Sequence, residues 1–272
     1  MDKFAILSSG SSGNCLFIEY KGSKILVDAG FSARKIENLL KEIGKDANEL
    51  DAIFLTHEHA DHTKGAGTLS RRYNIPIFAN GGTWKGIEKY VGKVKDENIR
   101  VFDSDKFLSF GSMDIMPIKT HHDANEPVGY ILYLGNQKIT ILTDTGIVDE
   151  NMAYEIKGSD IYYMEANHDL EALKRGPYPY PLKLRVMSNM GHLSNDQSAE
   201  VLADALEGKE EKVFLGHLSE TNNTPELSRL TVDNYLTSLG LDTKKDILLE
   251  VADRYAPSGI CLLYTSDAAD DL

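Results

Sequence analysis

The sequence predicts an α/β fold in which two mixed β-sheets pack face to face and helices cover them on the outside. Two groups of β-rich runs, one in the first third of the chain and one from residue 107 onward, are each interleaved with helical patterns. No linker separates the groups, and 272 residues is a size that layered α/β proteins reach as one unit. We therefore expect one domain over residues 1–260.

The first third predicts three short antiparallel strands, followed by helices and strands in alternation. Apolar residues in the first helical segment follow the i, i+3, i+4, i+7 spacing, at Ile36, Leu39, Leu40 and Ile43, and Gly44 ends it. The expected strands cover 3–9, 14–20, 24–30, 52–57 and 75–80, and the expected helices cover 33–44, 64–73 and 83–91.

The rest of the chain predicts further strands separated by glycine turns, and then strands and helices in alternation. Both late helical segments have Ser, Asn or Thr near their start and Gly at their end. The expected strands cover 107–120, 129–135, 138–146, 160–167 and 212–219, and the expected helices cover 195–208 and 224–240.

The last twelve residues, 261–272, follow neither pattern. Their beginning, CLLYTSDAADD, is a complete translation of a DNA string that resembles a transposon-based sequencing adaptor. We therefore expect the natural reading frame to end near Ile260 and the segment 261–272 to be a non-native tail.

Composition limits the classes of function. The net charge of −13 argues against a surface that is basic throughout, as a general nucleic-acid-binding protein would need, but leaves room for a local basic patch. The two cysteines, Cys15 and Cys261, are too few for a disulfide framework. The sequence has no apolar run of membrane-spanning length and no signal peptide, so we expect a cytoplasmic protein.

Residues 57–62, HEHADH, predict a metal site. The run places three histidines and two carboxylates in six positions directly after the apolar strand segment, where a loop can aim several side chains into one concavity. Imidazole and carboxylate together suit borderline divalent cations such as zinc, with iron or manganese as alternatives where carboxylates share the site. Such a loop can serve two ions.

The HxHxDH run and the upstream LVDAG resemble the metallo-β-lactamase superfamily of hydrolases, and IKTHHDANEPVGY, ILTDTG and VFLGHLS follow in that family's order. The resemblance implies the four-layer αββα fold, with one ion held by His57, His59 and His122, a second held by Asp61, His62 and His217, and Asp144 between the two ions. It also implies that Asp28 supports the cluster through hydrogen bonds without touching metal. Glu58 is expected to face away, and His121 has no assigned role.

More closely, LSSGSSGN, FLTHEHADHTKG, EANHD and GHLSN resemble the YycJ/WalJ-like family. This resemblance implies a cytoplasmic 5′ to 3′ DNA exonuclease that uses a metal-bridging hydroxide, in which Glu165 orients His192 toward the leaving oxygen and Asp61 holds the nucleophile. The sequence lacks room for the large inserted domain of related RNA-maturing and DNA-repair nucleases, and it has no evident tRNA-binding arm.

The remaining candidates concern substrate binding and stay open. The segment 173–185 combines four cations with two tyrosines, a pattern that suits nucleic acid but also a solvated Pro-rich loop. His168 fits either a substrate groove or a simple turn, and the loop SSGSSGN fits either a phosphate contact or a tight turn. The substrate-binding candidates are therefore His168, Lys174, Arg175, Lys183 and Arg185.

Two other functions remain as alternatives to the nuclease. A dinuclear centre also hydrolyses small esters, lactones, thioesters or cyclic phosphodiesters, and the charge of −13 favours a small substrate over a long polyanion. A metal-binding regulatory protein without turnover is the second alternative.

Overall fold

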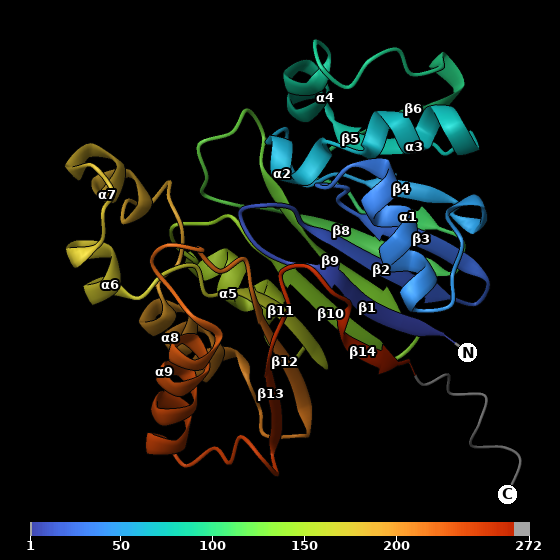
Figure 1. Ribbon diagram of the computed structural model, residues 1–272. Helices are drawn as coiled ribbons and strands as arrows, with labels where there is room; N and C mark the ends of the chain where they lie inside the picture. The colour runs from blue at the N-terminus through green and yellow to red at the C-terminus, as the bar shows by residue number, and fades with distance from the viewer. Residues whose placement is uncertain (1, 264–272) are drawn as a thin grey trace, which may run out of the picture.

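The computed structural model describes residues 2–263 and confirms two packed mixed sheets flanked by helices (Figure 1). Each sheet has seven strands, and each is antiparallel in one half and parallel in the other. The first sheet runs in the order β14 (Ser258–Leu262), β1 (Lys3–Ser8), β2 (Cys15–Tyr20), β3 (Ser23–Val27), β4 (Ala52–Phe54), β5 (Ile77–Asn80), β6 (Ile99–Phe102). The second runs in the order β13 (Ile247–Val251), β12 (Glu211–Gly216), β11 (Ile161–Glu165), β10 (Gln137–Leu142), β9 (Val128–Leu134), β8 (Met113–Lys119), β7 (Leu108–Phe110).

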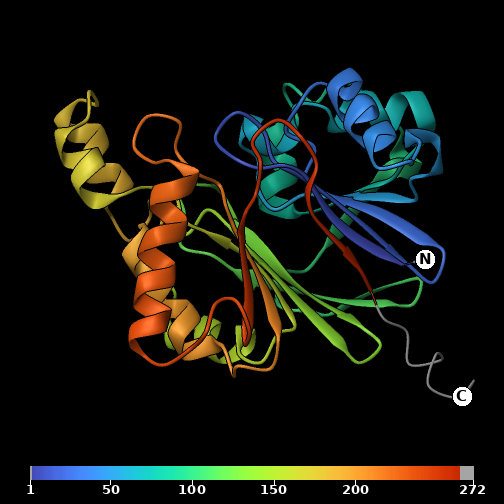
Figure 2. The same cartoon turned by 60° about the horizontal axis from the view of Figure 1, so that its bottom comes forward.

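Helices cover the outer face of each sheet, which gives four layers (Figure 2). The outer face of the first sheet packs in one apolar cluster with α1 (Ala33–Glu42), α3 (Ala66–Tyr73) and α4 (Gly81–Ile87). The outer face of the second packs in another with α5 (Glu150–Ile156), α8 (Asn195–Ala205) and α9 (Pro225–Ser238). Short helical turns lie at α2 (Ala60–Thr63), Ala47–Glu49 and Asp96–Asn98.

Both faces of each sheet are buried, which explains why the strands read as continuous apolar runs. In β1, Phe4 and Ile6 point into the core between the sheets, whereas Ala5 and Leu7 point toward the outer helices. This alternation is the two-residue period of a strand. The predicted strands and helices therefore appear close to their expected ranges.

The sequence analysis did not predict β6 or α5, and each has a physical reason. Strand β6 lies at the edge of the first sheet and exposes three of its four residues, so no buried alternating pattern marks it. Helix α5 has seven residues and buries only Met152 and Ile156, which is too short a pattern for helical periodicity to show.

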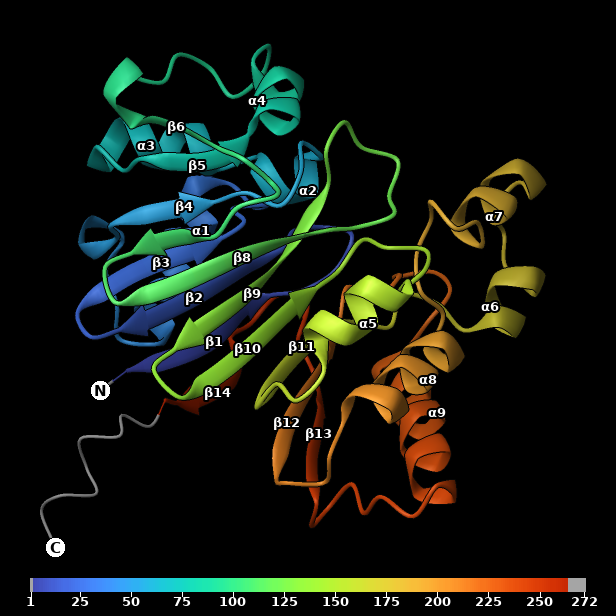
Figure 3. The same cartoon turned by 180° about the vertical axis from the view of Figure 1, so that it is seen from behind.

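The segment 173–185 is neither a plain loop nor part of the body. Helices α6 (Leu170–Arg175) and α7 (Tyr180–Val186), joined by Gly-Pro-Tyr-Pro, form an arm that projects from the molecule (Figure 3). Asp169 caps α6 by accepting a hydrogen bond from the backbone N–H of Ala172. We call residues 170–186 the arm.

The predicted non-native tail begins inside a paired strand. Cys261 pairs with Phe4 in the antiparallel β14–β1 ladder and is buried. The tail and the boundary of the domain at residue 260 remain predictions, and residues 264–272 lie outside the described residues. Among residues 2–263, no helix is long and apolar enough to cross a membrane.

Gly30 fixes the position of the loop that carries the histidine run. The backbone N–H of Gly30 donates to the carbonyl of Asn14, and that of Asn14 donates to the carbonyl of Asp61. A Cβ atom on Gly30 would lie 1.7 Å from the carbonyl oxygen of Asp61, so any side chain there must displace the loop.

We expect Gly30→Ala to lower the free energy of unfolding by about 2 kcal/mol or more, because the clash is with rigid backbone. Gly81→Ala is the matched control, because no atom lies within 4 Å of a Cβ built at Gly81, and its effect should stay within about 0.5 kcal/mol. Urea unfolding of the purified variants measures both, and equal stabilities would contradict this packing role.

Candidate metal centre

The candidate ligands lie at the carboxyl ends of strands from both sheets. The run 57–62 follows β4 and enters α2, His122 follows β8, Asp144 follows β10 and His217 follows β12. In each sheet these strands run in the same direction, so their carboxyl ends meet at one edge. The fold thereby joins side chains that are up to 160 residues apart in sequence (57 to 217).

The first group consists of His57, His59 and His122, whose ligand atoms lie within 4.8 Å of one another. Nε2 of His122 is 3.3 Å from Nδ1 of His59, and the rings of His57 and His59 are 4.6 Å apart between centroids. His57 and His122 are buried, whereas His59 is partly exposed. Three imidazoles facing one point form a site for one cation.

The second group consists of Asp61, His62 and His217, and Asp144 lies between the groups. Oδ2 of Asp61 is 3.5 Å from Nε2 of His62 and 3.5 Å from Nε2 of His217. Oδ2 of Asp144 is 3.2 Å from Nε2 of His62, and its Oδ1 is 3.7 Å from Nε2 of His122. The structure thus brings all seven predicted ligands together, with one carboxylate facing both groups.

The cluster does not satisfy its own polar atoms. Among the described residues, Nε2 of His57, Nε2 of His217 and Oδ2 of Asp144 are buried and make no hydrogen bond. Buried polar atoms without partners are costly in a folded protein. A donor set of imidazole nitrogens and carboxylate oxygens, with free atoms converging from two sides, fits divalent cations.

Charge compensation within the cluster keeps Asp144 ionised. Burial raises the pKa of this carboxyl, but the imidazoles of His217 and His62 outweigh burial and hold the pKa well below its usual range. An ionised carboxylate between two histidine groups is the form that binds cations.

Asp28 orients one ligand candidate and the loop that carries it. Its Oδ2 is 2.7 Å from Nδ1 of His62, which leaves Nε2 of that ring facing the cluster. Its Oδ1 accepts a hydrogen bond from the backbone N–H of Thr56, and the Thr56 hydroxyl donates to Oδ2 at 2.9 Å. Thr56 was not singled out from the sequence, because a threonine before a histidine carries no distinctive signal.

Three of the six non-glycine residues with left-handed backbone in the described part of the chain lie at the site. Asp28, Asp144 and His217 have φ values of 62°, 58° and 54°, in the left-handed region that side chains other than glycine rarely adopt. Each of these residues follows a strand and turns its side chain toward the cluster. Such strain persists where the surroundings over-determine it, which is typical of functional sites.

Glu165 connects the second ligand group to His192. Its Oε1 is 2.8 Å from Nδ1 of His192 and 2.8 Å from Nδ1 of His217, while its Oε2 accepts from the backbone N–H groups of Thr145 and Leu193. Burial raises the pKa of Glu165, but His192 and His217 outweigh it and bring the pKa to about 2. This carboxylate therefore stays ionised and fixes both rings with Nε2 directed away from it.

The neighbours of the ligands point elsewhere. Oε1 of Glu58 accepts a hydrogen bond from the backbone N–H of Asn125, so this side chain faces away from the histidines as expected. Nε2 of His121 is 2.8 Å from Oδ2 of Asp149, at the start of α5. Asn14, at the end of the loop SSGSSGN, was missed, although its Nδ2 lies 3.1 Å from Nε2 of His62.

The four cations of the arm are not equally placed. Lys174 and Arg175 pair with Glu171 on the same helix, and Nζ of Lys183 donates to the carbonyl of Lys174. Arg185 pairs with Asp123, the residue after His122, and lines a hollow together with His192. Only Arg185 of the four lines a hollow at the metal centre within the described residues.

His168, which the sequence left open between a substrate groove and a turn, lies in the interior. Its side chain has no exposed area, and among residues 2–263 neither ring nitrogen has a hydrogen-bond partner. Burial lowers its pKa to about 4. A fully enclosed ring cannot touch a substrate.

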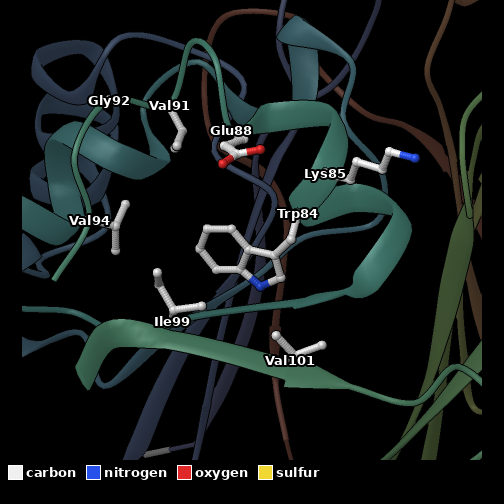
Figure 4. Close-up of a pocket in the computed structure, with 8 residues that line it drawn as sticks. All are labelled: Trp84, Lys85, Glu88, Val91, Gly92, Val94, Ile99 and Val101. Atoms are coloured by element: carbon white, nitrogen blue, oxygen red, sulfur yellow. The ribbon is translucent and has the colours of Figure 1, made fainter. Parts of the chain in front are cut away.

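A separate hollow of about 310 Å³ lies between α4 and β6 (Figure 4). The indole ring of Trp84 faces it, Ile99 and Val101 border it from β6, and the amino group of Lys85 points away. None of its eight lining residues belongs to the histidine and carboxylate groups. It is therefore not part of the candidate metal centre.

Residues 23–217 match the family model described as "Beta-lactamase superfamily domain". The exodeoxyribonuclease WalJ of Streptococcus pneumoniae strain D39 is 43% identical over 246 residues, which covers 90% of this chain and 91% of the relative. The exodeoxyribonuclease YycJ of Bacillus anthracis is 36% identical over 257 residues, which covers 94% and 97%.

Among solved structures, the metallo-β-lactamase fold protein YhfI from Bacillus subtilis matches with a TM-score of 0.71. The match covers 95% of this chain and 99% of YhfI at 17% sequence identity, so it establishes the fold.

The buried, neutral His168 predicts a pH dependence of stability. The pKa of this ring is about 4 in the folded protein and 6.5 in the unfolded chain. Between pH 6.5 and pH 4 the unfolded chain therefore binds a proton that the folded protein does not bind. The free energy of unfolding falls as the pH falls through this interval. Between pH 7 and pH 5 this group should cost about 2 kcal/mol. In urea unfolding, His168→Gln should lose less stability than wild type over that interval, whereas equal losses would contradict a neutral buried ring.

Proposed function

This chain belongs to the β-lactamase superfamily, and within it to the YycJ/WalJ-like family, and we propose that it is a dinuclear metal-dependent exodeoxyribonuclease acting 5′ to 3′. It is a metal-dependent hydrolase. We infer its substrate, its two metal ions and the residues that carry the reaction from the contacts described below.

The observation that carries the proposal is the pair of 2.8 Å contacts from Glu165 to His192 and His217. His217 belongs to the second ligand group, whereas His192 does not belong to either three-residue group that we assign to an ion. A protonatable ring held beside a water-activating centre is what a poor leaving group such as a nucleotide alkoxide needs.

We assign one ion to His57, His59 and His122 and a second to Asp61, His62 and His217, with Asp144 shared. Zinc suits these nitrogen and oxygen donors best, and manganese or iron are the alternatives. When bound, two such ions supply a hydroxide nucleophile at neutral pH and neutralise the charge of a phosphodiester.

The chain's own residues hold and move the protons. We assign Asp61, a quarter of whose side chain is exposed, to holding the attacking water in line. Glu165 favours the cationic form of His192, since burial lowers its pKa but the Glu165 charge outweighs this and raises it. His192 then donates its Nε2 proton to the departing oxygen.

The substrate assignment rests on the two relatives, both named exodeoxyribonucleases, and on the arm. With a net charge of −13 the surface repels a polyanion, so DNA must approach through a local region. The arm beside His192 presents Lys174, Arg175 and Lys183, which we assign to backbone contacts, whereas Arg185 pairs with Asp123. We propose a cytoplasmic location for this activity, as expected from the sequence.

Metal content tests the two assigned ion sites. We expect about two equivalents of zinc or manganese per chain in the wild type, by mass spectrometry of the digested protein. His122→Ala and His217→Ala should each lose about one equivalent, whereas His121→Ala, the matched control beside the ligand, should keep both. One equivalent in the wild type, or a loss in His121→Ala, would contradict the assignment.

Two substrates whose leaving groups differ in their need for a proton test the role of His192. His192→Ala should slow the degradation of end-labelled linear DNA by about 10²- to 10⁴-fold. The same variant should slow bis(p-nitrophenyl) phosphate hydrolysis far less, because p-nitrophenolate leaves without a proton. Equal losses on both substrates would remove the acid role.

Turnover of a lactone panel with no loss of DNA would favour the small-molecule hydrolase instead. No turnover of any substrate by the metal-loaded protein would favour a non-catalytic metal-binding protein. Parallel digestion of labelled RNA separates the two nucleic acids.

A further inference from the structure

A hollow of about 180 Å³ lies between the arm and the body of the protein, directly beside His192. The arm contributes one wall, and the loop after β1 and the loop after β12 contribute another, through Ser11 and Ser219. The proposed acid His192 is one of its lining residues, but the roles assigned above give no occupant to the hollow itself.

The two walls differ in chemistry. On the arm side, Tyr178, Leu182 and Val186 present an aromatic ring and aliphatic side chains. On the body side, Asn167 and Ser219 present neutral polar groups. Oγ of Ser219 accepts from the backbone N–H of Asn222 at 3.2 Å, which leaves its own O–H to donate. A flat ring with polar edges matches such a space.

Charge favours a neutral occupant over a phosphate. Arg185 lines the hollow but is already paired with the carboxylate of Asp123, which lines it too. A phosphate would therefore meet an anion together with the cation. His192 borders the hollow on the side of the candidate metal centre, and the other wall residues named above carry no charge, so the part of the hollow away from His192 suits an uncharged group with hydrogen-bonding edges.

Size limits the occupant to a single unit. Pockets for drug-sized ligands measure about 300–1,000 Å³, so this hollow is smaller than that range. One planar base can enter, whereas a base pair cannot. A base in the hollow must therefore have left its partner strand, as happens in enzymes that extrude a base from a duplex.

We propose that this hollow receives one unpaired nucleobase of the DNA substrate, stacked on Tyr178, and that a duplex end must open its terminal base pair before cleavage. This inference rests on the proposed exodeoxyribonuclease function and adds a base subsite to it. Stacking on a tyrosine tolerates every base, so the subsite selects an open end and not a sequence.

Duplexes whose terminal base pairs differ in stability test whether the end must open before cleavage. Wild type should degrade a duplex with a terminal mismatch about tenfold faster than the same duplex with a terminal G·C pair. Tyr178→Ala should slow both by roughly 5- to 150-fold, the range measured for loss of one stacked base, and Tyr178→Phe should restore the rate. Tyr180→Ala is the matched control, because Tyr180 is 70% exposed on the same arm but does not line the hollow.

Photocrosslinking gives a readout that does not depend on turnover. The probe is a linear duplex with 5-iodo-2′-deoxyuridine at the 5′ terminal position and phosphorothioate linkages that suppress cleavage, bound to the metal-loaded protein. Peptide mass spectrometry should find the crosslink on Tyr178 in wild type and in Tyr180→Ala, and should lose it in Tyr178→Ala.

The results of these two experiments distinguish the base subsite from the proposed exodeoxyribonuclease function. DNA degradation that is indifferent to the terminal pair and to Tyr178→Ala, or a crosslink on Tyr180, would overturn the base subsite and leave the nuclease intact. A crosslink on Tyr178 without any DNA degradation would support the subsite and overturn the nuclease. Neither degradation nor a crosslink would overturn both.

Discussion

The contact on which the site depends is a buried carboxylate shared by two imidazoles. Glu165 has no exposed area, and its Oε1 accepts from Nδ1 of both His192 and His217. One side chain thereby fixes both the ring that we assign to the second ion and the ring that we assign to the leaving group. A change at Glu165 would disturb nucleophile and acid together, so their relative position is set by a single side chain.

The fold provides the edge on which this contact can form. In both sheets the parallel strands end at the same side of the molecule. The histidine run, Asp144, Glu165 and His217, which follow or end β4, β10, β11 and β12, therefore lie close together. The left-handed backbone at Asp144 and His217 then turns both side chains into the cluster. The strain and the orphaned buried atoms are costs that bound cations offset, which explains why a stable α/β core carries such a cluster.

The sequence predicted which histidines and carboxylates would meet, because each lies in a short motif at a strand end. His57 to His62 are adjacent in the chain, and His122, Asp144 and His217 each follow a β-rich run in a recognisable order. The arm and the hollow beside His192 could not be predicted, because α6 and α7 bury few residues and the hollow depends on Ser11, Tyr178 and Ser219 meeting across the fold. The burial of His168 could not be predicted for the same reason, since burial is a property of packing and not of its local sequence.

The proposed function requires these residues to hold two cations that share Asp144. X-ray absorption spectroscopy of the protein loaded with two equivalents of zinc measures whether they do. We expect a metal–metal distance of about 3.5–4 Å and a shell of nitrogen and oxygen ligands only. Isolated ions without a metal–metal signal, or sulfur in the shell from Cys15 or Cys261, would contradict it.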